Sequence, residues 1–192
     1  EGLALDLTVE DTDGRPWDFN LEDKREKAKT MISNKEAMLV IGSPMCAAFS
    51  RLQSMNFAKM SDKDIAKVIE YGTRHLEFCM ELCRIQASNG LYFLHEHPAT
   101  ASSWHNDKVK EIMGLPGVKR VVSPMCAFGM TQQDSEGEKL VRKMTAFMTN
   151  SDRIADRLTR KCSLDHRHLV LLGGRAKRAE IYPEELARQI IK

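Results

Sequence analysis

Long apolar runs are missing from this chain of 192 residues. No segment approaches the roughly 18 consecutive apolar residues of a membrane-spanning helix, and no signal-peptide pattern opens the sequence. Low-complexity tracts and interdomain linkers are absent as well. We therefore expect one globular domain over residues 1–192 with no membrane partner, while the oligomeric state is left open.

Excess charge of either sign is also scarce, since the net charge is only +2. That value does not by itself indicate a nucleic-acid partner. Between Arg153 and Arg178, however, Asp156 and Asp165 are the only acidic residues among many basic ones. This segment could be a solvated surface or a patch that faces phosphates.

The cysteines lack the spacing of a secreted disulfide scaffold. Their number is five, which is odd, so we expect reduced thiols and an intracellular protein, either nuclear or cytoplasmic. Cys79 and Cys83 lie in a helical stretch and are predicted to be small buried residues. Cys162, His166 and His168 have the right chemistry for zinc, but no fourth ligand is evident nearby. We therefore assign no metal site and expect packing or polar contacts to the backbone there.

Signals for strands and helices alternate along the chain. Strands are expected at 3–8, 38–41, 91–94, 118–122, 144–148 and 169–172. Helices are expected at 21–33, 61–88, 107–113 and 151–160 and from 182 onward, while 131–139 is predicted to be a loop. Strands separated by helices predict an α/β fold with a mainly parallel sheet and helices on both faces.

A thiol and a carboxylate follow two of these strands. The apolar run 38–41 stops at Gly42-Ser43-Pro44, and Cys46 comes two residues later. The run 91–94 is followed at once by His95-Glu96-His97-Pro98. Open α/β sheets place their ligand crevices at the carboxyl ends of strands, so Cys46 and Glu96 are predicted to form a catalytic pair.

The sequence Ser-Pro-Met-Cys-Ala occurs twice, at 43–47 and at 123–127. Both copies follow an expected strand, but the residues after them differ. We interpret them as two strand-end loops with similar turn chemistry.

Several other chemistries lack a residue that they need. A zinc deaminase requires P-C-x-x-C, and Gly129 stands where its second cysteine would be. The metalloprotease pattern H-E-x-x-H is absent. A cysteine hydrolase needs a histidine base, and no local signature selects one. A thiolate with an acid nearby also suits methylation of a pyrimidine at carbon 5, where the thiolate adds to carbon 6 and the acid lies near N3.

The residues on which this chemistry depends resemble a known family. The segment 40–50 resembles the Pro-Pro-Cys-Gln loop and following Phe-Ser of DNA cytosine-5 methyltransferases, and 93–98 looks like their Glu-Asn-Val strand end. The likeness implies a Rossmann-like methyltransferase sheet, S-adenosylmethionine as cofactor, and DNA rather than RNA as partner. It implies Cys46 as the nucleophile and Glu96 as the group that faces N3.

The same likeness implies further site residues. Asp6, Asp18 and Pro44 would contact the cofactor, with Asp6 at the ribose and Asp18 at the adenine. Nucleic acid would be contacted by Ser50, Arg142, Lys143, Arg175 and Lys177. The pattern that includes Asp-Gly-x-x-Trp-Asp, His-Glu-His-Pro and Thr-Asn-Ser also resembles methyltransferase-like segments of retroelement polyproteins.

The glycine-rich first motif of the family is absent, and the chain starts with Glu1 at what resembles the second strand. We therefore expect a fold that lacks the first strand and the cofactor loop. A catalytically silent binding or structural module of a larger polyprotein is the alternative function.

Structural alternatives exist for each candidate site residue. Cys46 could be a small buried residue, and Glu96 could cap a helix or pair with Arg51. Asp6 and Asp18 could serve turns or helix caps.

Overall fold

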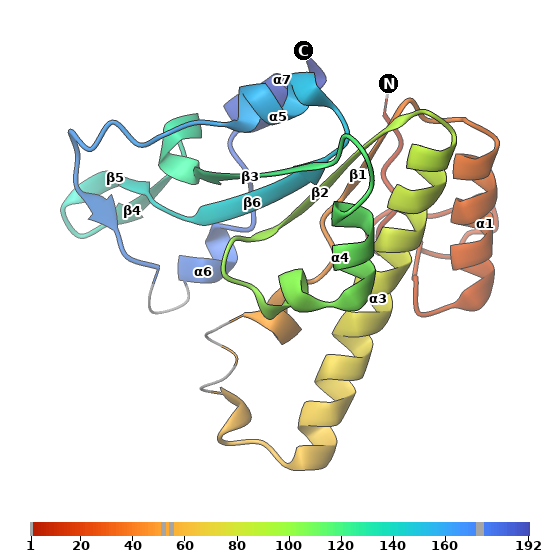
Figure 1. Cartoon of the computed structure of the whole chain (residues 1–192). Coiled ribbons are helices and arrows are strands. Elements are labelled where there is room, and N and C mark those ends of the chain that lie inside the picture. Colours follow the sequence, from red (N-terminus) through yellow and green to blue (C-terminus); the bar gives the residue numbers. More distant parts are fainter. Residues whose placement is uncertain (1, 51–52, 54–55, 172–174) are drawn as a thin grey trace.

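The computed structural model describes residues 2–50, 53, 56–171 and 175–192 (Figure 1). The helices are α1 (Glu22–Ser33), α3 (Asp62–Ser88), α4 (Asp107–Met113), α5 (Asp152–Leu158), α6 (Arg175–Arg178) and α7 (Glu184–Ile191). The strands are β1 (Leu39–Gly42), β2 (Tyr92–Pro98), β3 (Lys119–Pro124), β4 (Thr131–Asp134), β5 (Gly137–Val141), β6 (Met144–Thr149) and β7 (His168–Leu169). Short 3-10 turns are η1 (Ala47–Phe49), η2 (Ser102–His105) and η3 (Met125–Phe128).

The central sheet has four strands in the order β1-β2-β6-β3. β1 and β2 are parallel, whereas β6 is antiparallel to both of its neighbours. β3 therefore runs in the same direction as β1 and β2. The fold is α/β, but the prediction of a mainly parallel sheet is wrong, because the chain goes from β3 to β6 through a hairpin. A parallel neighbour would have needed a connection that crosses back along the sheet, usually through a helix.

That hairpin lies where a loop was expected, so the prediction for 131–139 is wrong. β4 and β5 pair in antiparallel register, and β5 also pairs with β7 in a small second sheet. The residues of β4 alternate between exposed and half-buried positions, which explains their polar composition. β7 is shorter than the predicted strand at 169–172, whose last residue lies outside the described part of the chain.

Residues 3–8 do not form the predicted strand. Leu3 and Leu7 are exposed, and the Asp6 carboxylate instead accepts hydrogen bonds from the backbone N–H and the hydroxyl of Thr8, at 2.7 and 2.6 Å. Such local bonds compete with strand pairing. The turn is therefore favoured over an extended strand.

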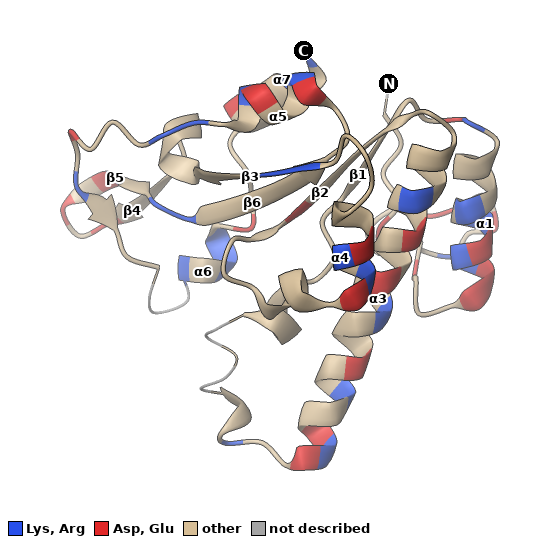
Figure 2. Cartoon of the chain, viewed as in Figure 1, with Lys and Arg blue, Asp and Glu red and all other residues tan. Residues whose placement is uncertain are grey.

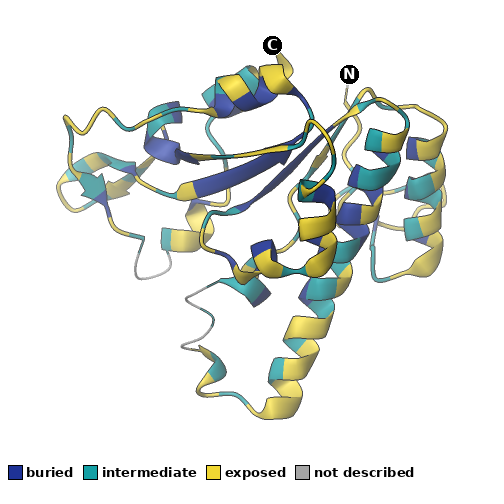
Figure 3. Cartoon of the chain, viewed as in Figure 1, coloured by how far each residue is buried: buried dark blue, intermediate teal, exposed yellow. Residues whose placement is uncertain are grey.

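Helices cover both faces of the central sheet, as predicted. On one face, Phe93, Ala146 and Met148 belong to the apolar cluster that contains residues of α3 and α4. On the other face, Leu94 and Phe147 pack in the cluster that contains residues of α5 and α7. Figures 1 and 3 show this layered arrangement, with buried residues along β2 and β6 and exposed residues on the first turns of α3. None of the described helices is both long and apolar enough for a membrane span.

Most of the predicted helices are confirmed. α3 begins where Ser61 accepts a hydrogen bond from the N–H of Asp64 at 3.2 Å, and it ends at Asn89-Gly90. Gly90 takes φ 71°, a conformation that glycine adopts at little cost. Ser151 caps α5 in the same way, and Pro183 precedes the first turn of α7.

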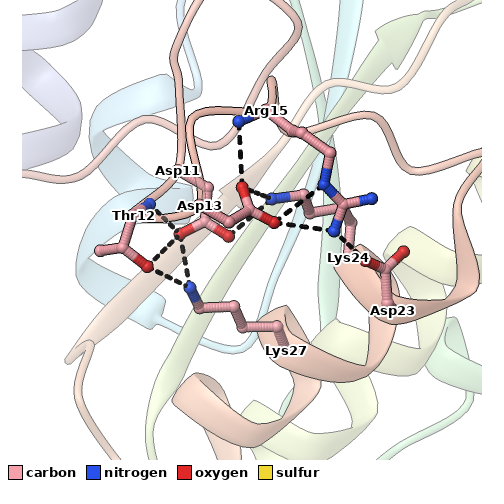
Figure 4. Close-up of polar contacts among 7 residues, drawn as sticks. All are labelled: Asp11, Thr12, Asp13, Arg15, Asp23, Lys24 and Lys27. Carbon is pink, nitrogen blue, oxygen red and sulfur yellow. Dashed lines mark hydrogen bonds and ion pairs between the residues drawn. The ribbon is translucent and has the colours of Figure 1, made fainter.

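A network of charged side chains attaches the turn at 11–16 to α1 (Figure 4). The Lys24 ammonium is buried and lies 2.7 Å from an oxygen of Asp11 and 2.7 Å from an oxygen of Asp13. Lys27 reaches the other oxygen of Asp11 at 2.5 Å. The network holds the N-terminal segment on α1 and brings the following Trp17 into the core.

Candidate functional site

β1 and β2 bring Cys46 and Glu96 to the same end of the sheet, where the carboxyl ends of both strands lie. The strands are parallel, with Gly42 opposite His95, so the loop after β1 lies beside the end of β2. Gly42 is needed at this point because a Cβ there would lie 2.2 Å from the Cys79 sulfur. The two predicted catalytic residues therefore belong to one locality.

The loop that carries Cys46 is held by His97. The His97 Nε2 lies 3.0 Å from the Pro44 carbonyl oxygen, and its Nδ1 lies 2.5 Å from the Ser103 hydroxyl. Burial lowers the pKa of His97 to about 3, so the imidazole is neutral near pH 7. A neutral ring with its proton on Nε2 donates to Pro44 and accepts from Ser103, which fixes the loop.

Glu96 is almost fully buried and has a partner that the sequence did not indicate. The Tyr182 hydroxyl, just before α7, donates a hydrogen bond to its carboxylate. Lys143 in turn donates to the Tyr182 hydroxyl at 2.9 Å and to the Ala179 carbonyl at 3.2 Å. Burial, together with the Glu96 charge, raises the pKa of Tyr182 far above its usual range. Arg51, the other suggested partner of Glu96, lies outside the described residues.

Electrostatic effects connect Cys46 to the same group of side chains. Burial raises the pKa of the Cys46 thiol, and the charges of Glu96 and Glu180 raise it further. The Lys143 ammonium acts in the opposite direction. Cys46 is thus a thiol near neutral pH, and its reactivity depends on the balance between one cation and two carboxylates.

A cavity of about 970 Å³ lies beside the loop that carries Cys46, between the N-terminal segment, β1 and α3. Asp6, Asp18 and Pro44 all line it, so the structure brings together the three residues predicted to contact a cofactor. Trp17 and Phe19 also line it. Its size suits a small-molecule ligand, since such pockets measure about 300–1,000 Å³.

Asp6 and Asp18 both accept hydrogen bonds from residues two positions further along the chain, as side chains in turns do. One oxygen of Asp18 accepts from the N–H and the side-chain amide of Asn20, at 2.9 and 2.8 Å. Asp6 makes similar contacts with Thr8. Asp6 and Asp18 therefore stabilise local turns and also line the cavity.

The residues predicted to contact nucleic acid differ in their exposure. Arg142 and Lys177 are exposed, while Arg175 and Ser50 are half-buried. Lys143 has its ammonium directed toward Tyr182. Figure 2 shows basic residues on α6, and others lie in the loop after α5.

The two copies of the repeated pentapeptide differ in local structure. The first copy follows β1 and ends at the first residue of η1, whereas the second begins with the last two residues of β3 and contains the first three residues of η3. Cys79 and Cys83 are buried in α3, as predicted. Cys126, from the second copy, lies close to Cys162, His166 and His168. Cys126 is the fourth possible metal ligand, which the sequence around Cys162 did not reveal. The repeated motif was the signal that could have drawn attention to it.

The Thr-Asn-Ser sequence links β6 to β2. The Asn150 amide accepts from the N–H of Phe93 at 2.9 Å and donates to the carbonyl of Leu91 at 2.8 Å. The Thr149 hydroxyl donates to the Phe93 carbonyl at 2.6 Å. The motif thus fixes the start of the strand that carries Glu96.

In comparisons with known proteins, no family model, curated protein or solved structure matches the chain.

Proposed function

We propose that this chain is a cytosine-5 methyltransferase-like domain that uses Cys46 as nucleophile and Glu96 as the group beside N3 of the base. The observation that supports this most strongly is the position of Cys46 in the loop after β1 and of Glu96 near the end of the adjacent parallel strand β2, within electrostatic reach of each other. Methylation at carbon 5 needs a thiol and an acid on one side of a pyrimidine ring.

The cavity beside the loop supports S-adenosylmethionine as the cofactor. The acidic side chains of Asp6 and Asp18 offer acceptors for hydroxyl and amino groups, and Trp17 and Phe19 offer apolar surface for a flat ring. Bound there, the cofactor would supply the methyl group. Pro44 and Met45, which directly precede Cys46, line this cavity and Cys46 does not, which suits a donor on one side of the loop and the base on the other.

In the proposed reaction the Cys46 thiolate forms a bond to carbon 6 of cytosine. Carbon 5 would then take the methyl group from the cofactor, whose sulfur–methyl bond would break to leave S-adenosylhomocysteine, and a hydrogen bond from the Glu96 carboxyl to N3 would stabilise the charge that develops on the ring. Loss of the carbon-5 proton then breaks the sulfur–carbon bond and restores the thiolate. Lys143 would favour the thiolate form, because its charge lowers the pKa of Cys46.

DNA is the proposed substrate, with exposed Arg142 and Lys177 as phosphate contacts. In a duplex, the target cytosine would have to leave the base stack to reach Cys46. Substitution of either cation by glutamine is expected to weaken binding for all sequences alike and to reduce its salt dependence.

Trapping with 5-fluorocytosine tests this function. The fluorine replaces the proton that must leave carbon 5, so the sulfur–carbon bond cannot break and an adduct stable to SDS accumulates. We expect this adduct with DNA and S-adenosylmethionine for the wild type and not for Cys46→Ala, while Glu96→Gln reduces its rate. Absence of an adduct with the wild type, or equal trapping by Cys46→Ala, would contradict the proposal.

Two observations favour the second candidate, a silent binding or structural module. The Tyr182 hydroxyl already occupies the Glu96 carboxylate, and burial keeps Cys46 protonated. Tyr182→Phe distinguishes the two functions. It should increase trapping if Tyr182 merely competes with the base, and it should leave no trapping at all if the module is silent.

A further inference from the structure

Four side chains with soft or borderline ligand atoms meet between η3 and the segment that follows α5. They are Cys126, Cys162, His166 and His168, and one ligand atom from each lies within 4.8 Å of all the others. Apart from Cys126, which is buried, they are half-buried. Neither the thiol of Cys46 nor the cavity beside it is part of this cluster.

The separations among three of the four ligand atoms are close to those around a tetrahedral ion. The Cys162 sulfur lies 3.5 Å from Nε2 of His166 and 3.3 Å from Nε2 of His168, and these two nitrogens are 3.0 Å apart. Zinc bonds of about 2.3 Å to sulfur and about 2.0 Å to nitrogen place tetrahedral ligand atoms about 3.3–3.8 Å from one another. Small movements would complete the geometry.

The chain curls to bring these atoms together. Side chains two residues apart on an extended chain lie on the same face, and the rings of His166 and His168 are neighbours, 4.6 Å apart and nearly perpendicular. Leu164 takes φ 62°, which is uncommon for a residue with a branched side chain, and its N–H donates to the Cys162 sulfur at 3.4 Å. The turn at Leu164 thus brings the Cys162 sulfur within 3.5 Å of Nε2 of both histidines.

A second layer of contacts prepares His166 as a ligand. Its Nδ1 lies 2.7 Å from a carboxylate oxygen of Asp165, whose other neighbour is the Ser163 hydroxyl at 2.5 Å. A carboxylate at Nδ1 fixes the proton there and leaves the lone pair on Nε2 for a metal. This is the arrangement that metal-bound histidines commonly have.

We propose that Cys126, Cys162, His166 and His168 bind one Zn²⁺ ion at a structural site. Two sulfur and two nitrogen ligands select zinc over magnesium or calcium, which prefer oxygen. Four protein ligands leave no open position, so the site has a structural rather than a catalytic role. Binding releases the two thiol protons to solvent, and the two thiolates balance the charge of the ion.

The ion would join η3, which follows β3, to β7 and thus to the chain segment that leads into α6 and α7. Tyr182, the partner of Glu96, lies in that segment. The site therefore fixes the C-terminal part of the chain on the central sheet. This inference does not depend on the proposed methyltransferase activity.

Metal content tests the proposal. The 192-residue chain, purified under reducing conditions from cells supplied with zinc, should contain one zinc per chain by elemental analysis. Replacement by Co²⁺ should give the intense visible bands of a tetrahedral ion and a thiolate charge-transfer band. Cys162→Ser and His168→Ala should lose the ion, whereas the controls Cys46→Ser and His105→Ala should keep it, because neither residue is in the cluster.

A ligand-preserving variant covers the case in which the ligand variants do not fold. His166→Cys retains four ligands and should still hold one zinc, and native mass spectrometry should show the mass of one zinc less the protons it displaces. Wild-type chain that is folded but binds neither zinc nor Co²⁺ would overturn the proposal. So would a Cys162→Ser variant that keeps full zinc content.

Discussion

At the level of single residues, the thiol of Cys46 responds to the charges around it. Lys143 lowers its pKa, and Glu96 raises it. Glu96→Gln should therefore lower the pKa of Cys46 and speed its alkylation near neutral pH, whereas Lys143→Met should slow it. The measurement is the rate of iodoacetamide modification of Cys46 as a function of pH, followed by peptide mass spectrometry.

Lys177→Met is the matched control for this prediction, because Lys177 is an exposed cation that is not among the charges acting on Cys46. Its alkylation profile should coincide with that of the wild type. Equal effects of Lys143→Met and Lys177→Met would mean that the overall charge of the protein, and not the local contact, governs the thiol.

His97 gives the fold a dependence on pH. Its pKa is about 3 in the folded chain against an ordinary value of 6.5, because burial disfavours the charged ring. Below pH 6.5 the His97 ring is protonated in the unfolded chain but stays neutral in the folded chain. The contribution of His97 to stability is therefore complete above pH 6.5 and is lost as the pH falls toward 3, by about 1.4 kcal/mol per pH unit.

His97→Gln tests this dependence, since an amide can still donate to the Pro44 carbonyl but does not titrate. The free energy of unfolding, measured in urea at several pH values, should fall less steeply with acid for the variant than for the wild type. Parallel curves for the two proteins would show that His97 is not kept neutral by the fold.

At the level of elements, the turn after Cys46 packs closely on α3. A Cβ at Gly72 would lie 2.6 Å from the Cβ of Ala48 in η1. Gly72→Ala should therefore push η1 away from the helix at a cost of about 1–3 kcal/mol, offset in part by about 1 kcal/mol of better helix propensity. Alkylation of Cys46 should change as well, because η1 begins directly after it.

The double variant Gly72→Ala/Ala48→Gly removes the methyl group that clashes. It should recover both the unfolding free energy and the alkylation rate, apart from the cost of a glycine in η1. If Gly72→Ala alone is as stable as the wild type and reacts at the same rate, the close approach of η1 to α3 does not control the loop.

The elements that the sequence predicted correctly are those with strong local signals. α3 has a serine cap and a glycine end, and β1 and the first residues of β2 are apolar, so the positions of these elements follow from nearby residues. β2 nevertheless continues to Pro98, beyond its predicted end at residue 94, so Glu96 lies within the strand and not in a loop after it. The direction of β6 depends instead on which connection precedes it. The polar β4–β5 hairpin has no alternating apolar pattern to reveal it.

The candidate site divides in the same way. Cys46 and Glu96 were predictable because each follows an apolar run that forms a strand. Tyr182 and Cys126 were not, because each reaches its neighbours only through the tertiary fold, from a distant part of the chain. Three of the four clustered metal-ligand residues are close in sequence, and the fourth comes from another strand end.

For the molecule as a whole, the buried charges around Lys24 decide how firmly the N-terminal segment is held. Lys24 is 1% exposed and the side chain of Asp11 is 3% exposed, so neither charge can turn to water if its partner is removed. Lys24→Met should lower the melting temperature, and it should expose the segment before α1 to proteases. The cavity wall formed by Asp6 and Asp18 would loosen at the same time.

Arg15→Gln is the control within the same network, because the Arg15 side chain is half exposed and its pairs with Asp13 and Asp23 are in contact with solvent. Exposed ion pairs contribute little to stability, so the melting temperature of this variant should be close to that of the wild type. Its N-terminal segment should be cleaved by proteases as slowly as in the wild type. In the double variant Lys24→Met/Asp11→Asn, the loss should be smaller than the sum of the two single losses, because the second substitution removes a carboxylate that the first has left without one of its cations. Additive losses, or equal effects of Lys24→Met and Arg15→Gln, would show that the buried contact does not anchor the segment.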